Sequence, residues 1–255
     1  MTKKSTPKKE SREEVFVPSE LDSKQVNFKI APLKFKSQKQ KDFFDLCRDE
    51  DIKLLICDGP AGSGKSMISI YAALKQLKAG KYEKIMYLRS PVGSSDKDIG
   101  FLPGSMEEKI INYMHPLDEK LSKFVEFHDI KKLYEHDKIE YAINTFIRGR
   151  SIENTIIILD ETQNLKLSEN FSIMSRTEET TKIIAIGDHM QADIGLDSSL
   201  SKLMMMFGDE EKNVEESLEN GVATFKFDNE DIVRSKLTRF IVEKFERYNK
   251  ISRRN

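Results

Sequence analysis

Gly59-Pro-Ala-Gly-Ser-Gly-Lys-Ser66 is the stretch of sequence that decides the fold. It matches the pattern G-x-x-x-x-G-K-S/T, whose glycines let consecutive backbone N–H groups turn inward around phosphate oxygens. The apolar run from Lys53 to Asp58 precedes it, and the helical spacing of Met67 to Leu77 follows it. A strand, a glycine-rich turn and a helix in this order form the context in which the pattern binds nucleotide phosphates.

The residues of this loop predict the two cofactors, ATP and Mg²⁺. Lys65 supplies a positive charge for the β- and γ-phosphates, and Ser66 supplies a hydroxyl ligand to Mg²⁺. The helix that starts near Lys65 points the positive end of its dipole at the same anion. We therefore expect every residue of the loop to bind nucleotide: Gly59, Pro60, Ala61, Gly62, Ser63, Gly64, Lys65 and Ser66.

A second motif follows the apolar run from Thr155 to Leu159, which ends in the acids Asp160 and Glu161. A buried strand that ends in an acid places the carboxylate at the edge of the sheet where ligands bind. Asp160 is predicted to hold Mg²⁺, directly or through water, and Glu161 to orient or deprotonate the attacking water. The alternative is that both acids are simply a solvated strand end.

A third motif, Gly187-Asp188-His189-Met190-Gln191, follows the apolar run that starts at Lys182. Gln191 is in a position to sense the γ-phosphate by hydrogen bonding. The alternative is an ordinary exit from a strand into a turn, and we expect His189 to be a turn residue. None of the four histidines has metal-ligand spacing with another.

Continuous apolar strands separated by helices predict an α/β fold, a P-loop NTPase with a mostly parallel sheet and helices on both faces. We expect one ATPase domain over residues 37–250, with an insertion near 99–132. Residues 1–36 form a basic, flexible N-terminal segment in which 15–35 can also be a strand or a clasp, and residues 251–255 form a flexible end. The acidic stretch 209–220 is predicted to be an exposed loop, and the methionines 204–206 to be core.

Composition excludes several classes of protein. The chain has 42 Lys and Arg residues and 43 Asp and Glu residues, so its net charge argues neither for nor against binding to nucleic acid. Two cysteines cannot build a disulfide framework or a zinc site. No apolar stretch is long enough to span a membrane, and with reduced thiols we expect a cytoplasmic protein.

The motifs resemble those of the PhoH-like ATPases. The resemblance extends from Gln38 to the last helix, and we include Gln38 among the nucleotide-binding residues. The resemblance is carried by the phosphate loop and, in the expected order, by Asp98-Ile-Gly-Phe-Leu-Pro-Gly104, Glu108-Lys109, Pro116-Leu117, Arg148-Gly-Arg150, Leu159-Asp-Glu-Thr-Gln-Asn164, Gly187-Asp188, Gln191-Ala-Asp193 and Asp231-Ile-Val-Arg234. It implies a single RecA-like core related to superfamily 1 helicases, assembled in rings, with ATP-dependent work on RNA. Ser63 and Ser66 stand where Thr is commoner in the family.

One core lacks a group that two-core helicases obtain from the second core, namely a positive charge on the γ-phosphate in the transition state. Arg234, which resembles the late helicase motif, is our first candidate for this arginine finger. Arg176 and either Arg148 or Arg150 come next. If a neighbouring copy supplies the arginine, the head-to-tail contact closes into a ring, for which we expect a hexamer. The alternative is that these arginines make surface ion pairs.

Two functions remain open at this stage. The first is a helicase-like ATPase that remodels RNA or single-stranded DNA, which the motif series and local basic clusters favour. The second is a nucleotide-gated interaction or assembly protein that hydrolyses ATP slowly without binding nucleic acid, which the near-neutral charge and the acidic stretch favour. A small-molecule kinase ranks third, because the sequence contains no lid motif.

Overall fold

The structure is a computed structural model of the chain, and it describes residues 26–89, 116–142, 151–195 and 198–233, with residues 237, 240–245 and 248 of a last helical stretch. Helices and strands alternate along the described chain, and η marks a short 3-10 helix. The elements are α1 (Gln38–Arg48), β1 (Leu54–Asp58), α2 (Lys65–Lys78), β2 (Lys84–Arg89), α5 (Phe127–Glu135), β3 (Ile139–Ala142), β4 (Thr155–Asp160), η2 (Thr162–Asn164), α6 (Leu167–Met174), β5 (Lys182–Gly187), η3 (His189–Gln191), α7 (Leu200–Gly208), α8 (Glu211–Glu219), β6 (Val222–Lys226) and η5 (Asn229–Asp231).

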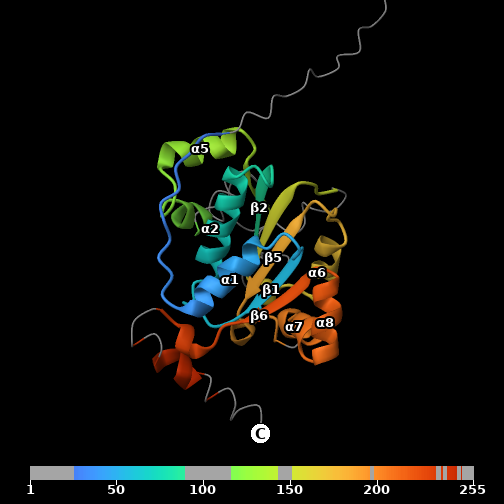
Figure 1. The fold of residues 1–255 in the computed structure, drawn as a ribbon. Coiled ribbons are helices and arrows are strands. Elements are labelled where there is room, and N and C mark those ends of the chain that lie inside the picture. The colour runs from blue at the N-terminus through green and yellow to red at the C-terminus, as the bar shows by residue number, and fades with distance from the viewer. Residues whose placement is uncertain are drawn as a thin grey trace, which may run out of the picture.

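The strands form one six-stranded sheet in the order β3-β2-β4-β5-β1-β6 (Figure 1). Every strand pairing in the described part of the chain is parallel. The two central strands β4 and β5 are buried along their whole length, which explains their continuous apolar sequences. The predicted α/β fold, a RecA-like P-loop domain with a parallel sheet, is confirmed.

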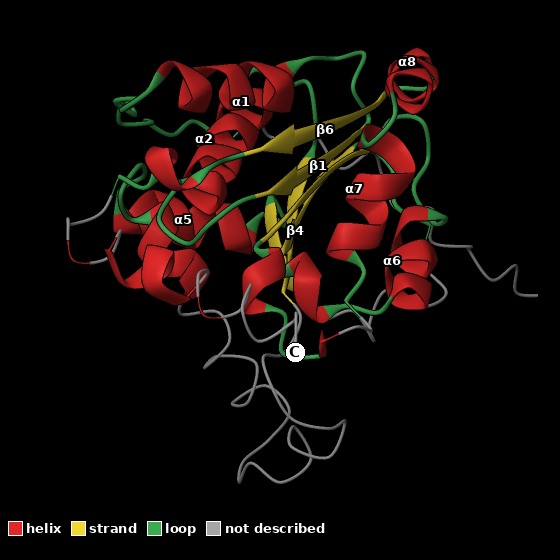
Figure 2. Cartoon of the chain, turned by 90° about the horizontal axis from the view of Figure 1, so that it is seen from below, coloured by secondary structure: helices red, strands yellow, loops and turns green. Residues whose placement is uncertain are grey.

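Helices cover both faces of the sheet (Figure 2). Side chains of β4 alternate between the two faces, so Ile156 and Ile158 join the core under α1 and α2, whereas Ile157 and Leu159 join the core under α6. A smaller cluster joins Ile56 of β1 to α7. Because both faces are packed, the polar groups of the strands can meet a ligand only at the ends of the sheet.

The N-terminal part of the described chain packs against the fold in an extended conformation (Figure 1). Phe28 is buried, and its carbonyl oxygen accepts a hydrogen bond of 2.6 Å from the Lys78 ammonium. The backbone N–H of Ala31 donates to the carbonyl of Phe124 at 2.8 Å. Residues 26–36 therefore pack against the fold, ahead of residue 37, where the sequence analysis places the start of the ATPase domain.

The second half of the predicted insertion is also part of the core. Residues 116–121 are helical, and Leu117 and Leu121 are buried in the main core cluster with Phe124 and Val125. The first half of the insertion, 99–115, lies outside the described residues.

The structure differs from two predictions about the region before β6. The acidic stretch is not a loop but contains helix α8, which packs against α7 and β6 and buries Ser217. Of the three methionines predicted to be core, Met204 packs against the cluster that contains Leu200 and Leu203. Met205 and Met206 are exposed, since α7 buries its leucines against the sheet and turns these two methionines away. Among the described residues, no helix combines the length and apolar character that crossing a membrane requires.

Candidate functional site

The carboxyl ends of four strands meet at one edge of the sheet. In the register of the sheet, Asp58 at the end of β1 lies opposite Gly187 at the end of β5, and Arg89 at the end of β2 lies opposite Asp160 at the end of β4. Parallel strands all leave the sheet at this edge, which is where open α/β sheets bind their ligands. The three motifs predicted from the sequence start here.

The phosphate loop joins β1 to α2 in a tight turn. Gly62 and Gly64 have φ values of 92° and 96°, in the left-handed region that glycine adopts without a steric penalty. The Lys65 ammonium donates to the carbonyl oxygens of Gly59 and, at 3.0 Å, Pro60. These carbonyls hold the ammonium inside the loop, and a bound phosphate would replace them as its acceptor.

A glutamine of α1 supports the loop from outside, but it is not the predicted one. Gln40 is buried, and its Nε2 donates to the carbonyl of Ser63 at 2.8 Å. Gln38 is exposed and donates instead to Asp42 Oδ1 at 2.8 Å. The two residues lie on different sides of the helix because they are two positions apart. In this structure the glutamine in contact with the phosphate loop is Gln40.

Asp160 is the centre of a compact polar cluster. Its Oδ1 accepts from Ser66 Oγ at 3.2 Å, and its Oδ2 accepts from the Tyr87 hydroxyl and, at 2.9 Å, from the Lys120 ammonium. Burial by itself raises the pKa of the Asp160 carboxyl, but the Lys120 ammonium and the Tyr87 hydroxyl lower it by more, so its pKa falls below the ordinary value. Asp160 is therefore a buried carboxylate held in its charged form.

Glu161 has an unusual backbone conformation, with φ 60° and ψ 39°. A left-handed conformation is uncommon outside glycine, and such residues cluster at functional sites. One carboxylate oxygen lies 3.4 Å from an Arg89 guanidinium nitrogen, and the other accepts from Gln163 Nε2 at 2.6 Å. The Glu161 carboxylate is thus fixed beside Asp160 by two neighbours.

Gln163 also connects Glu161 to the third motif. Its Oε1 accepts from the backbone N–H of Asp188 at 3.0 Å. The absence of a side chain at Gly187 makes this approach possible, because a Cβ there would lie 2.5 Å from Gln163 Oε1. Asp188 Oδ2 in turn accepts from the N–H of Ala61 at 3.1 Å and from Gln191 Nε2 at 2.8 Å. The third motif therefore contacts the phosphate loop directly.

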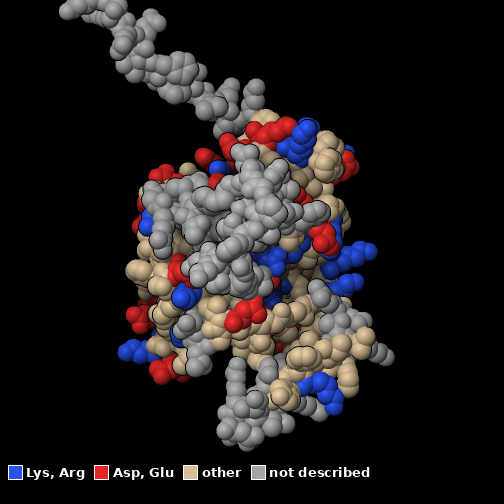
Figure 3. Space-filling model, turned by 180° about the vertical axis from the view of Figure 1, so that it is seen from behind, with Lys and Arg blue, Asp and Glu red and all other residues tan. Residues whose placement is uncertain are grey.

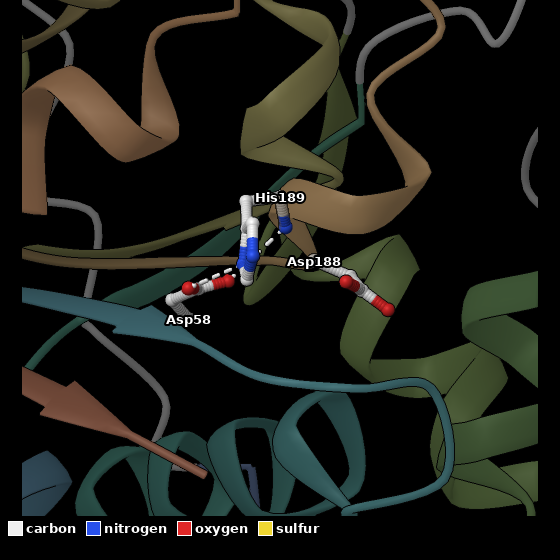
Figure 4. A group of neighbouring side chains, drawn as sticks. All are labelled: Asp58, Asp188 and His189. Carbon is white, nitrogen blue, oxygen red and sulfur yellow. Dashed lines mark hydrogen bonds and ion pairs between the residues drawn. The ribbon is translucent and has the colours of Figure 1, made fainter. Parts of the chain in front are cut away.

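His189 pairs with Asp58, the last residue before the phosphate loop (Figure 4). Its Nδ1 lies 2.7 Å from Asp58 Oδ2, and its backbone N–H donates to Asp58 Oδ1 at 3.1 Å. The hydrogen bond to Asp58 raises the pKa of His189 more than burial lowers it. Burial raises the pKa of Asp58, but the hydrogen bond and charge of His189 outweigh it and the pKa falls. The pair joins the end of β1 to the first residue of η3.

Asp58, Asp188 and His189 bring their ligand atoms within 4.8 Å of one another, close enough for one metal ion. The oxygens of Asp188 already accept from Ala61, Met190 and Gln191, and those of Asp58 face His189. These three residues brace the loop through contacts they already make with protein groups.

Two cavities open beside the phosphate loop. The first, which we name the phosphate-loop cavity, has a volume of 380 Å³ and is lined by Ala61, Gly62, Gly64, Lys65, Ser66, Met67, Lys120, Lys123, Asp160, Glu161, Gly187, Asp188, Gln191 and Val233. The second, the β6 cavity, has a volume of 690 Å³ and is lined by Lys39, Gly59, Pro60, Asp188, His189, Met190, Lys226, Phe227, Asp228, Asn229, Glu230 and Asp231. Asp188 belongs to both walls.

Eight of the predicted site residues line the phosphate-loop cavity together: Ala61, Gly62, Gly64, Lys65, Ser66, Asp160, Glu161 and Gln191. Arg176 lines neither cavity. Arg234, Arg148 and Arg150 lie outside the described residues. Sequence reasoning missed Gln40, Tyr87, Arg89, Lys120 and Gln163. The sequence contains a feature that could have pointed to Arg89, since this residue ends an apolar strand as Asp160 does. It contains no such feature for Lys120.

The residues of this cavity fit a nucleotide phosphate chain with Mg²⁺. Ser66 Oγ and Asp160 Oδ1 are only 3.2 Å apart, and hard oxygen donors of this kind are the ligands that Mg²⁺ prefers. The first turn of α2 and the loop amides present positive dipoles to the same space. In this site Ser66 and Asp160 would hold the ion, and Lys65 would meet the phosphates.

Comparison with known proteins places these features in a family. A family model described as "PhoH-like protein" matches residues 32–246. A PhoH-like protein of Synechocystis is 31% identical over 83% of this chain and 62% of its own length. Protein PhoH of Escherichia coli K12 is 33% identical over 74% of this chain and 51% of its own length, so the chain spans about half to two thirds of these relatives. Among solved structures, the Sulfolobus solfataricus SWI2/SNF2 ATPase core in complex with dsDNA matches 77% of this chain and 46% of its own, at 16% identity and a TM-score of 0.42.

Proposed function

The chain belongs to the PhoH-like family, and on this premise we propose that it binds ATP with Mg²⁺ and hydrolyses it in the phosphate-loop cavity. The observation that carries the proposal is the convergence of Lys65, Ser66, Asp160 and Glu161 on one cavity of 380 Å³. When bound, Mg²⁺ would supply positive charge that neutralises the phosphate oxygens.

The side chains of the cavity divide the work. Lys65 leaves the loop carbonyls and pairs with the β- and γ-phosphates, while Ser66 and Asp160 hold the ion. Glu161 accepts a proton from the attacking water, a role that suits a carboxylate already oriented by Gln163 and Arg89. Gln191 lies against Asp188, which contacts the loop, so it is in a position to sense the γ-phosphate.

We further propose that the active form is a ring, a hexamer, in which Arg234 of one copy completes the site of the next. Exposed apolar side chains on three elements support self-association: Phe171 on α6, Met205 on α7, and Phe245 and Tyr248 on the last helical stretch. A head-to-tail contact between unlike surfaces closes into a ring when the rotation permits.

Mixing two inactive variants tests the ring. Lys65→Ala removes the phosphate contact and Arg234→Ala removes the finger. If the finger acts in trans, mixed rings contain some intact sites and part of the activity returns. Full activity of a monomeric species, measured by light scattering with ATP present, would exclude the ring.

The polymer on which the ATPase acts is proposed to be RNA or single-stranded DNA, in the cytoplasm. Figure 3 shows basic and acidic side chains interspersed, with one group of Lys and Arg near the middle of the face it draws. The acidic helix α8 and the near-neutral net charge favour the second candidate, a nucleotide-gated assembly protein that does not bind nucleic acid.

Steady-state ATPase rates with and without poly-U RNA separate the two candidates, with Lys65→Ala as the blank. If the protein remodels nucleic acid, the ATPase rate should rise when RNA is added and fall again when salt is added. Salt weakens the binding because contacts to RNA phosphates release counterions. A measurable rate that RNA leaves unchanged favours the assembly protein. A wild-type rate equal to that of Lys65→Ala would contradict the ATPase itself.

A further inference from the structure

Lys120 reaches the phosphate-loop cavity from a part of the chain that no nucleotide motif covers. Its ammonium lies 2.9 Å from Asp160 Oδ2 and 3.0 Å from the Tyr87 hydroxyl oxygen. Only 23% of the Lys120 side chain and 7% of the Asp160 side chain are exposed. The ion pair is therefore shielded from water, unlike ordinary surface pairs, which contribute little.

The backbone that carries Lys120 is firmly held. Leu117 and Leu121 are each 1% exposed and pack in the main core, one on each side of Lys120 in the sequence. Asp118 accepts from the Tyr134 hydroxyl at 2.8 Å, which attaches the same turn to α5. The ammonium is thus delivered to the cavity by a packed element and not by a free surface arm.

Lys120 and Mg²⁺ require the same carboxylate. Asp160 now accepts from Ser66 on one oxygen and from Lys120 on the other. A divalent ion held by Ser66 and Asp160 neutralises the charge that attracts the ammonium, and like charges in a shielded cavity repel. The bound ion would weaken the attraction between Asp160 and Lys120, and the γ-phosphate of ATP would bring a new acceptor for the ammonium into the cavity that Lys120 lines.

We propose that Lys120 is a further catalytic residue, whose ammonium moves from Asp160 to the γ-phosphate when Mg²⁺-ATP binds and there stabilises the charge of the transition state. This inference rests on the proposed ATPase function. It gives the site a positive charge from its own chain, besides any arginine from a neighbour. Since ADP has no γ-phosphate, Lys120 distinguishes ATP from ADP.

Lys123 provides a matched control. It lines the same cavity and follows Lys120 by three residues, but its side chain is 53% exposed and its nearest acid, Glu119, is 4.0 Å away. Changing it removes the same charge from the same cavity without touching Asp160.

Equilibrium binding of a non-hydrolysable ATP analogue and of ADP, both with Mg²⁺, tests the inference without turnover. Lys120→Met is expected to lower the affinity for the ATP analogue by about 10- to 100-fold, the effect of losing a charge-assisted hydrogen bond, and to leave the affinity for ADP unchanged. Lys120→Arg should keep most of the preference for the analogue, and Lys123→Met should keep all of it. Lys120→Ala repeats the comparison if Lys120→Met does not fold.

Two results overturn the inference. If Lys120→Met lowers the affinities for the analogue and for ADP equally, Lys120 only shapes the site. If it changes neither affinity, Lys120 stays on Asp160. A wild-type chain that binds neither nucleotide overturns the proposed function and the inference with it. Nucleotide binding by the wild type, with no selective loss in Lys120→Met, overturns the inference alone.

Discussion

The two cavities beside the phosphate loop differ in the partners of their charged side chains. In the phosphate-loop cavity, Lys65 and Lys120 have protein partners that a nucleotide with Mg²⁺ would replace: Lys65 donates to loop carbonyls, and Lys120 pairs with Asp160. In the β6 cavity the charges pair across elements, with His189 against Asp58 and Lys39 against Asp228 and Asp231. The first arrangement is suited to chemistry, whereas the pairs of the second join β1 to η3 and α1 to η5.

This difference gives a rule for substitutions. Changes in the phosphate-loop cavity should alter turnover or nucleotide binding more than stability, whereas changes at the Asp58–His189 pair should alter stability and its dependence on pH. The predictions below test the rule, starting with the largest expected effect.

Glu161→Gln is expected to lower turnover by about 10²–10⁴-fold, the usual contribution of a general base, because the amide keeps the shape of the side chain but accepts no proton. Nucleotide binding should remain. Asp160→Ala should instead weaken Mg²⁺-dependent binding. Single-turnover hydrolysis with a separate binding assay distinguishes the two variants, and a normal rate in Glu161→Gln would exclude Glu161 as the base.

Gly187→Ala is expected to lower turnover by up to about 100-fold, since small displacements of catalytic groups have effects of this size. The new Cβ would lie 2.5 Å from Gln163 Oε1, so Gln163 must move and release Glu161 and the Asp188 N–H. In a Gln163→Ala background, Gly187→Ala should lower turnover by less, because the shortest clash of the new Cβ, with Gln163 Oε1, is absent while its contact with Leu200 remains. Additive losses in that double-mutant cycle would show that Gly187 acts elsewhere.

His189→Gln is expected to have the smallest effect on turnover and a pH-dependent effect on stability. The raised pKa of His189 means that its contribution is full below the unfolded value of about 6.5 and is lost as pH rises through the folded pKa. The lowered pKa of Asp58 means that its contribution is present above about 3.9 and is lost as pH falls through its folded pKa.

Urea unfolding of wild type and His189→Gln at several pH values measures this effect. The difference in the free energy of unfolding should be greatest between about pH 4 and 6.5 and should shrink as the pH rises further. A difference that grows above neutral pH would contradict the pairing.

The parts of the site that could be read from the sequence are those where local chain geometry dictates the position. The loop glycines, the acids after β4 and Gln191 after β5 all follow buried strands, so their meeting at one edge follows from the parallel sheet. Lys120 could not be predicted, because its position depends on how Leu117 and Leu121 pack in the core. Gln40 was missed for a related reason, since only the orientation of α1 separates it from Gln38.

The same limit explains the errors near β6. An acidic composition suggested a loop at 209–220, yet α8 forms there because tertiary packing on α7 and β6 stabilises it. The position of Arg234 is likewise beyond what local sequence can give, and it lies outside the described residues.

Thermal unfolding with and without Mg²⁺-ATP tests the central claim, nucleotide binding in the phosphate-loop cavity, most directly. Ligand at about 100 times its dissociation constant adds about 2.7 kcal/mol, and each kcal/mol moves the melting point of a domain of this size by about 2–4 °C. We predict an increase of several degrees in the wild type and none in Lys65→Ala. An unchanged melting point in the wild type, or an equal increase in Lys65→Ala, would contradict the claim.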